Sequence, residues 1–268
     1  MKYRRRHIQP KIYSLRKRKS LFTRPMFWLA LILLMLVAGA AYGILFYERF
    51  QVKNLVVSGT QRLQKEEVES FLWQEIAKKP LLLPSKSIFL VSQKELSRTL
   101  LEKFPGIGSV QITKNYPDGL VVAISERQPF AVFCATSLDE DCFYMDETGV
   151  LFEKIQGIEV SFLIVRQDVN SGSFIAGQSA IPANAIQALR DVKNSLKSNF
   201  NIDIKEAFVS NPLVFTTSEN WKAYFDPEGD MDFQINKMNL LLKDEIPESV
   251  RKNMQYLYLQ YKDRAYHK

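Results

Sequence analysis

Histidine and cysteine are both scarce in this chain of 268 residues, which has two of each. The histidines are His7 and His267, close to opposite ends of the sequence. A catalytic triad or a zinc site needs several such side chains close together, so a histidine-based site in the body of the protein is excluded. The chain also lacks a Walker phosphate-binding loop and a Lys-Thr-Gly motif. We therefore expect no catalytic residues, no metal site and no cofactor.

Two short patterns resemble sites but have simpler interpretations. Residues 249–252, SVRK, match the Ser-x-x-Lys acylation motif of penicillin-binding enzymes. They fall in a connection between a predicted helix and a predicted strand, and a four-letter pattern of this kind arises by chance. Asp139, Glu140 and Asp141 form an acidic run that resembles a metal cluster. A solvated loop is the better interpretation of that run.

The two cysteines, Cys134 and Cys142, have seven residues between them. Such close spacing favours a disulfide if this part of the chain lies in an oxidising compartment. In a reducing compartment they would be two ordinary half-buried thiols. The choice between a disulfide and two thiols therefore depends on the compartment, and the charge distribution along the chain helps to predict that compartment.

Acidic residues are absent from the first 25 positions, which hold ten Lys and Arg residues. The remainder of the chain has 26 basic and 29 acidic residues, a charge of about −3, although the whole chain carries +7. A basic arm can bind nucleic acid. The apolar segment that follows favours a topology signal and a contact with anionic lipid instead. We expect a basic cytoplasmic tail over residues 1–25 and no nucleic-acid partner.

Charge is absent from residues 26–47, MFWLALILLMLVAGAAYGILFY. A helix of this length measures about 33 Å, close to the hydrocarbon thickness of about 30 Å. Trp28 and Tyr47 lie near its ends, where aromatic rings favour the membrane interface. Residues 38–40, AGA, resemble a signal-peptide cleavage site, but the apolar run continues beyond the usual length of about 7–15 residues. We expect a retained transmembrane helix, with the N-terminus cytoplasmic and residues 48–268 outside because basic residues concentrate before it.

Residues 50–127 predict a small domain of order β-α-α-β-β. Residues 50–59 are rich in β-forming residues and end in Ser-Gly, which indicates a strand and a turn. Apolar residues of 63–79 and of 92–104 recur at helical spacing, and 92–95 have the form of a capping box. Alternating apolar residues on both sides of a turn at 116–119 predict a hairpin. The predicted core includes Phe71, Phe89 and Phe104 on the helical and connecting segments, and Leu120, Val122 and Ile124 on the last strand.

A boundary between two domains follows at Glu126, Arg127 and Pro129. Proline lacks an N–H group and cannot continue a central strand. The next strand comes so soon that we expect the second domain, residues 128–268, to pack near the first. This second domain is predicted to be mixed and mainly β, so the whole fold is α+β. Its predicted strands are residues 130–135, 142–145, 150–153, 162–165, 205–210, 213–217 and one strand near the C-terminus. Residues 181–200 are predicted as a helix, and residues 220–248 as a strand, a turn and a helix that carries Ile235, Met238 and Leu242.

Several motifs in this order resemble the FtsQ/DivIB family of bacterial cell-division proteins, clearly over residues 1–153 and loosely beyond. The family has a membrane-proximal domain called POTRA, which corresponds to residues 50–127. The quoted pieces are VKNLVVSG, SQKEL, VQITKNYPDGLVVAISERQPFAVF and YMDETGVLF. The matched positions are Tyr116 and Pro117; Glu126, Arg127, Pro129 and Ala131; and Asp146, Gly149, Val150 and Leu151.

The resemblance implies a scaffold of the bacterial divisome in the cytoplasmic (inner) membrane at the division septum. The implied partners are single-span coiled-coil division proteins of the FtsB and FtsL type and, through them, the septal peptidoglycan synthase complex. Two alternatives are an envelope enzyme that acts on peptidoglycan and a POTRA-type component of a secretion system. The first lacks a nucleophile or paired carboxylates above chance. The second lacks a long series of alternating ten-residue strands.

The resemblance also implies that a partner docks near the end of the chain as an added strand. We predict a strand that includes residues 256–261, with Leu257, Leu259 and Tyr261 toward the core. The predicted partner-binding residues are Tyr256, Leu257, Tyr258, Leu259, Gln260 and Tyr261. Similar proteins carry Asp at the position of Tyr258 and Arg at that of Gln260, so we expect a more apolar contact here. The alternative is that both outward tyrosines only cover the sheet of their own domain.

Overall fold

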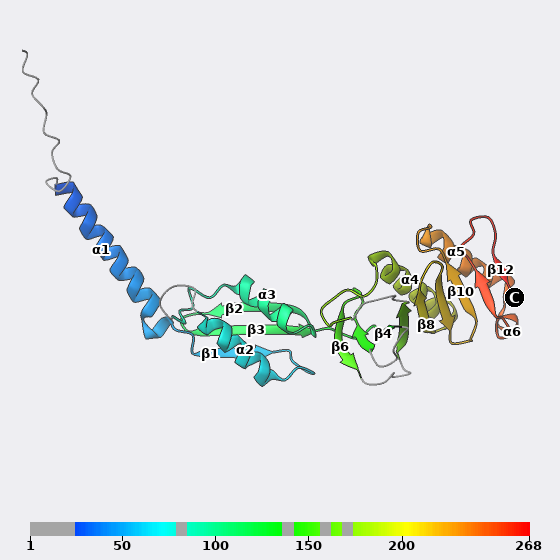
Figure 1. Cartoon of the computed structure of the whole chain (residues 1–268), viewed down its shortest axis with the longest axis horizontal. Helices are drawn as coiled ribbons and strands as arrows, with labels where there is room; N and C mark the ends of the chain where they lie inside the picture. The colour runs from blue at the N-terminus through cyan, green and yellow to red at the C-terminus, as the bar shows by residue number, and fades with distance from the viewer. Residues whose placement is uncertain (1–24, 79–84, 136–141, 156–161, 168–173) are drawn as a thin grey trace, which may run out of the picture.

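A computed structural model describes residues 25–78, 85–135, 142–155, 162–167 and 174–268 (Figure 1). Within these ranges the chain forms an apolar helix followed by a first domain and a second domain. The predicted basic tail, apart from residue 25, and the acidic run at 139–141 lie outside the described residues. The α+β fold class predicted from the sequence is confirmed.

The first helix, α1 (Pro25–Phe46), begins and ends one residue before the predicted transmembrane segment. It is the one helix among the described residues that is long and apolar enough to cross a membrane. None of its residues is buried within the protein. An apolar helix of this length with no buried residue fits a single-pass membrane protein.

The first domain has the predicted order of elements. These are β1 (Asn54–Ser58), α2 (Lys65–Ala77), α3 (Gln93–Lys103), β2 (Ile107–Asn115) and β3 (Gly119–Glu126). The strand order is β1-β3-β2, with β1 parallel and β2 antiparallel to the central β3. Both helices pack on the sheet and bury its apolar face. The buried residues include Val68, Leu72 and Ile76 of α2, Leu96 and Leu100 of α3, and Leu120, Val122 and Ile124 of β3.

Two details of the first domain differ from the prediction. Phe50 does not begin the first strand but ends a short 3-10 helix, η2 (Glu48–Phe50), which follows α1 directly. Phe89, predicted in the core, is 46% exposed. Its segment lies beside the end of α1 and outside the domain core. The apolar character of Phe89 therefore does not indicate burial within the domain.

Gly59, at the turn after β1, has a backbone geometry that requires glycine. Its φ is +89°, and a Cβ atom placed there would lie 1.9 Å from the carbonyl oxygen of Ile124. A side chain would therefore separate β1 from the central strand.

The second domain contains one nine-stranded sheet in the order β12-β11-β10-β9-β8-β7-β4-β5-β6. Its first part, β4–β7, is formed by β4 (Ala131–Ala135), β5 (Cys142–Met145), β6 (Leu151–Ile155) and β7 (Leu163–Gln167). Its last part, β8–β12, is formed by β8 (Ile204–Val209), β9 (Leu213–Thr217), β10 (Lys222–Phe225), β11 (Tyr256–Tyr258) and β12 (Tyr266–His267). The predicted strands thus occur, with ends displaced by a few residues.

Helices cover one face of this sheet. The largest are α4 (Ala183–Phe200) and α5 (Met231–Leu240), which continues into a π-helical segment, η3 (Leu241–Glu245). α6 (Glu248–Arg251) precedes β11. The core between helices and sheet includes Leu189, Val192, Phe215, Trp221 and Leu257, all fully buried. The opposite face therefore carries the alternate residues of each strand.

The C-terminal strand is shorter than predicted, and β11 does not form the edge of the sheet. β11 ends at Tyr258 and pairs with β10 on one side and β12 on the other. Leu257 and Leu259 are buried as predicted, but Tyr261, predicted to face the core, is 45% exposed. It lies in the loop that turns the chain back to β12, so strand alternation does not extend to it. Among the described residues, β12 is the outer strand at this end of the sheet.

Candidate functional site

The distal end of the second domain carries a group of tyrosines on β10, β11 and their surroundings. Tyr224 and Tyr266 both pair with Tyr258 across the sheet, so their side chains share one face. This is the face opposite the helices, because the intervening residues Ala223 and Leu257 are buried in the helix-covered core.

The tyrosine rings contact one another in two groups, with Tyr224, Tyr256 and Tyr258 in one and Tyr261 and Tyr266 in the other. Ring centroids of Tyr224 and Tyr258 lie 4.4 Å apart and stack, and those of Tyr256 and Tyr258 lie 5.0 Å apart. Tyr261 and Tyr266 meet edge to face at 5.7 Å. We call these five residues the tyrosine surface. Aromatic rings in such contact hold one another in place, and amphipathic rings of this kind are enriched at protein interfaces.

The structure divides the predicted partner-binding residues into two groups. Tyr256 and Tyr258 are half-buried and Tyr261 is exposed, so all three are accessible. Leu257 and Leu259 are fully buried and belong to the core. Gln260 is half-buried. Sequence reasoning missed Tyr224 and Tyr266, because their place beside Tyr258 depends on pairing between strands that are far apart in the chain.

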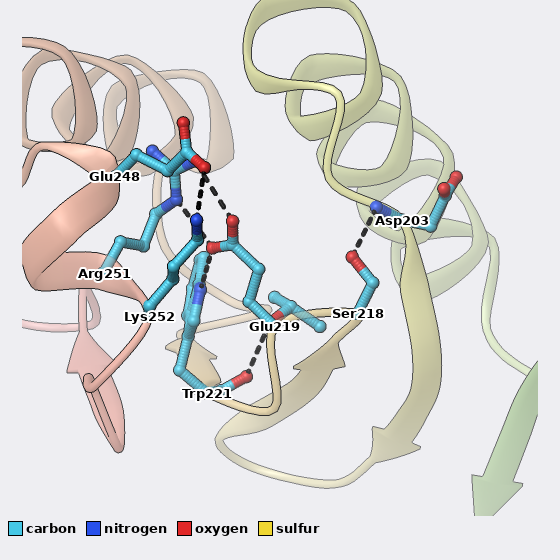
Figure 2. A network of polar contacts seen from close by, with 8 residues as sticks. Asp203, Ser218, Glu219, Trp221, Glu248, Arg251 and Lys252 are labelled. Carbon is cyan, nitrogen blue, oxygen red and sulfur yellow. Dashed lines mark hydrogen bonds and ion pairs between the residues drawn. The ribbon is translucent and has the colours of Figure 1, made fainter.

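An ion pair supports the segment before β11, as Figure 2 shows. Arg251, at the end of α6, donates from Nε and Nη2 to the two carboxylate oxygens of Glu219, at 2.6 and 3.1 Å. The Trp221 indole N–H donates to the same carboxylate at 3.0 Å. Burial alone would raise the pKa of Glu219, but these bonds outweigh it and lower that pKa. The network ties α6, and with it the start of β11, to the turn between β9 and β10.

The Ser-x-x-Lys pattern lies on this short helix and has no catalytic geometry. Lys252 pairs with Glu248 at 2.8 Å, one turn away, and Ser249 is exposed on the helix surface. Among the described residues no group of three or more His, Cys, Asp and Glu side chains could hold a metal ion.

A second group of polar contacts lies where the two domains meet. Glu126, at the end of β3, accepts hydrogen bonds from the backbone N–H groups of Gln61, Arg62 and Leu63 at 2.8–3.1 Å. Burial alone would raise the pKa of Glu126, but the backbone donors outweigh this and lower it. The carboxylate therefore closes the loop that follows β1 against the end of β3.

Arg127 joins the two domains. Its backbone N–H donates to the carbonyl of Gly106 at 2.8 Å and its Nε to that of Pro105 at 3.0 Å, both in the first domain. Its Nη1 forms an ion pair with Asp146 of the second domain. The Arg127 and Asp146 side chains are 20% and 11% exposed. Two motifs of the sequence, Glu-Arg-x-Pro and Asp-x-x-Gly, therefore meet in space. We call this group the domain junction.

The turn that holds Asp146 is ordered by the same carboxylate. Its Oδ1 accepts hydrogen bonds from the N–H and hydroxyl of Thr148 at 2.9 and 2.7 Å and from the N–H of Val150 at 3.0 Å. Burial alone would raise the pKa of Asp146, but these bonds and Arg127 lower it. A second ion pair nearby joins Arg62 to Glu153 at 3.9 Å. The first and second domains thus meet through defined side-chain contacts.

Cys134 and Cys142 are direct cross-strand partners on β4 and β5, with a Cα–Cα distance of 4.4 Å. The structure joins them in a disulfide. Both lie on the sheet face opposite the helices, in a small apolar cluster with Val132. The bridge therefore closes a loop at the end of β4 and β5, far along the sheet from the tyrosine surface.

Comparison with known proteins addresses the first domain most directly. Residues 50–127 match the model of the POTRA domain of FtsQ type. The chain is also 26% identical over 142 residues to the cell division protein FtsQ of Syntrophotalea carbinolica. That alignment covers 53% of this chain and 45% of the relative, so it spans about half of each protein. The β-α-α-β-β fold after an apolar helix agrees with these matches: residues 50–127 form a POTRA domain of FtsQ type, and the chain is similar to a cell division protein FtsQ over about half of its length.

Proposed function

We propose that this chain is a single-pass membrane scaffold of the bacterial divisome. Its N-terminus lies in the cytoplasm, and its two domains lie outside the cytoplasmic membrane at the division septum. There it binds other division proteins and helps to recruit or regulate septal cell-wall synthesis. The observation that carries the proposal is a POTRA domain of FtsQ type that directly follows a helix suited to crossing a membrane.

The tyrosine surface and the adjacent edge of β12 are the proposed partner site. An incoming extended segment can pair with the free side of an edge strand, and this gives main-chain hydrogen bonds. Tyrosines on the neighbouring strands supply apolar contact and hydroxyl groups, the combination found at binding hot spots. The buried Leu257 and Leu259 keep β11 in place and take no part in contact.

The proposed partners are single-span coiled-coil division proteins of the FtsB and FtsL type, and through them the septal peptidoglycan synthase. Anchoring both proteins in one membrane raises their effective concentration, so a modest interface suffices. The site needs no catalytic residue, because its role is to hold partners near one another.

The test is depletion and capture in dividing cells of the source bacterium. Depletion of the chain should block septation, so that cells elongate without dividing, and the intact gene should restore division. Crosslinked pull-down of the full chain should recover the coiled-coil proteins and the septal synthase. Normal division after complete depletion, or recovery of a secretion complex in place of division proteins, would refute the proposal.

Orientation is tested separately with fusions to the full chain. A reporter active only outside the cytoplasm should work after residue 268 and fail before residue 2, because basic residues concentrate on the cytoplasmic side of a span. Activity in the opposite pattern would place both domains in the cytoplasm.

A further inference from the structure

The end of α1 is bonded to the POTRA domain. The carbonyl oxygen of Leu45 accepts hydrogen bonds from Gln51 Nε2 at 2.9 Å and from Ser85 Oγ at 2.7 Å. Gln51 in turn accepts from the N–H of Lys86 at 2.8 Å. The segments around residues 51 and 85 are therefore fixed at the point where the apolar helix ends.

Four aromatic rings lie together at this end of the domain. Successive ring centroids are 6.1 Å apart from Tyr47 to Phe50, 5.4 Å from Phe50 to Phe89, and 5.7 Å from Phe89 to Tyr116. Tyr47, Phe89 and Tyr116 are 60%, 46% and 58% exposed. We call these four residues the juxtamembrane aromatic patch.

Three separate segments bring the patch together. The N–H of Ile88 donates to the carbonyl of Phe50 at 2.8 Å, which joins the segment of Phe89 to the one that follows α1. The carbonyl of Asp118, in the β2–β3 turn that carries Tyr116, accepts from the N–H groups of Lys53 and Asn54 at 2.9 and 3.2 Å. This turn lies at the α1 end of the domain (Figure 1). The patch is thus part of the folded domain.

The exposure of Phe89 calls for a physical reason. Its ring has no polar atom, and burial of a Phe side chain is favourable. Other apolar residues of this domain are buried in its core. The exposure of Phe89 therefore does not reflect the lack of a core in this domain. Aromatic rings favour the boundary between hydrocarbon and headgroups, where one side is apolar and the other wet. The patch begins at Tyr47, one residue after α1 ends, and so continues the surface of the membrane helix.

The polar surroundings suit a headgroup layer. Arg49 and Lys53 are exposed next to the patch, with Glu48 exposed and Asp118 half-buried. Lys86 is also exposed, and its Nζ lies 5.6 Å from the centroid of the Trp73 ring on α2. Lysine side chains extend their charged ends toward headgroups while their stems contact apolar groups. Basic groups close to the surface also gain from anionic lipids.

We propose that the juxtamembrane aromatic patch inserts into the lipid interface on the outer side of the membrane and docks the POTRA domain there. The inference rests on the proposed membrane anchoring by α1. The occupant is the bilayer because the patch is continuous with the end of α1 and bonded to it. Docking holds the domain in one orientation to the membrane and fixes the height at which the second domain presents its tyrosine surface.

The experiment measures fluorescence of the full chain in nanodiscs made with either ordinary phosphatidylcholine or phosphatidylcholine brominated near the headgroup end of its acyl chains. Bromine quenches tryptophan only at short range. Tyr116→Trp and, separately, Phe89→Trp each add one indole to the patch. Phe233→Trp is the matched control, because Phe233 is 50% exposed on α5 of the second domain. The fluorescence of the unchanged chain is subtracted from that of each variant to give the fluorescence of the added indole. The difference between the unchanged chain and Trp28→Phe gives the fluorescence of Trp28 within α1.

The added indoles at positions 116 and 89 should lose about half of their fluorescence in brominated nanodiscs, because aromatic rings favour the interface. The indole at 233 should be unaffected, and Trp28 should be quenched. Quenching of Trp28 without quenching at 116 and 89 would overturn the docking while leaving the anchor intact. Absence of Trp28 quenching would remove the anchor and the docking together. Iodide quenching of the indole at position 116 can also be compared between cell envelopes and nanodiscs. Protection from iodide in envelopes but not in nanodiscs would assign the patch to a protein partner and overturn the proposal.

Discussion

The chain exposes aromatic side chains at both ends of its two-domain region, and the two sets differ in construction. The juxtamembrane aromatic patch consists of rings before and on a short helix, on a connecting segment and in a hairpin turn, and none of its four residues lies within a strand. Four of the five residues of the tyrosine surface lie on the adjacent, paired strands β10, β11 and β12, and β12 is the outer strand at that end of the sheet. A lipid surface needs only rings at the right depth, whereas an extended protein segment needs an edge as well. Exposure alone therefore does not identify a partner; the backbone beneath the rings distinguishes the two cases.

The domain junction determines whether these two surfaces act at a fixed separation. Arg127 contacts two carbonyl groups of the POTRA domain and the Asp146 carboxylate of the second domain. Because both charged groups are largely buried, the pair is held by its surroundings and is screened less by salt than a surface pair.

The largest effect is expected from Arg127→Ala. This change leaves the largely buried Asp146 without its cation, and removal of one partner of a buried pair costs about 3–5 kcal/mol. We expect a loss near the lower end of that range, because the pair is not completely enclosed. Urea denaturation of the full chain in detergent, followed by a probe in the second domain, measures the change in unfolding free energy.

Arg98→Ala is the matched control for this experiment. Arg98 pairs with Glu102 at 2.9 Å on α3, with both side chains more than half exposed. Exposed pairs of this kind contribute about 0.2–1 kcal/mol. Equal losses for Arg98→Ala and Arg127→Ala would show that the domain junction has no special role in linking the domains.

The next effect concerns the tyrosine surface. Tyr256→Ala and Tyr258→Ala should each weaken binding of the proposed coiled-coil partner by about 1–3 kcal/mol, with the melting temperature unchanged. Binding is measured with both full chains in nanodiscs, at two salt concentrations. The loss should vary little with salt, because the contact is largely apolar.

Phe233→Ala serves as the control, since Phe233 is an exposed aromatic residue on the helical side of the same domain. It should bind like the unchanged protein. Full affinity for both tyrosine variants would mean that these rings only cover the sheet of their own domain, and the partner site would have to be sought elsewhere.

The disulfide should have a smaller effect on stability. The loop closed by Cys134 and Cys142 is short, and the entropy model gives about 2.5 kcal/mol for a loop of this size. Mass spectrometry of unreduced protein should show no free thiol, and the double Cys→Ser variant should unfold at a somewhat lower temperature. Two free thiols in protein taken from its native envelope would show that the bridge does not form there. Partner binding should be unaffected, because the bridge is remote from the tyrosine surface.

The sequence predicted the elements well where the pattern is local. Alternation of Leu120, Val122 and Ile124 defines the buried face of β3, and Ser92 begins α3 by accepting a hydrogen bond from the N–H of Glu95 at 3.3 Å. Each of these features depends on neighbours in the chain. The order β-α-α-β-β followed from them.

Features that depend on distant segments were not predicted in detail. Tyr224 stacks on Tyr258 only because β10 and β11 pair in parallel, and no local pattern specifies that register. Tyr261 continues the alternation of the sequence, yet lies in the loop where the strand has already ended. Phe89 has the apolar character of a core residue, but its surroundings are set by the end of α1. The contact between Arg127 and Asp146 likewise joins two motifs whose meeting only the fold reveals.

The smallest predicted effect is a dependence of stability on acid pH. The folded-state pKa values of Asp146 and Glu126 are lowered, so both carboxylates contribute stability above their unfolded-state pKa values near 4. That contribution is lost as the pH falls through the folded-state values. Melting temperatures measured from pH 6 to pH 3 should fall, and Asp146→Asn should reduce this slope. An identical slope for Asp146→Asn would place the acid sensitivity outside the domain junction.

The most direct test of the two-surface account is photo-crosslinking in dividing cells from single positions of the full chain. A benzophenone amino acid replaces either Tyr116 in the juxtamembrane aromatic patch or Tyr258 in the tyrosine surface. The account predicts that position 258 gives an adduct with a division protein, whereas position 116 gives adducts with lipid. A protein adduct from position 116 together with none from position 258 would contradict it.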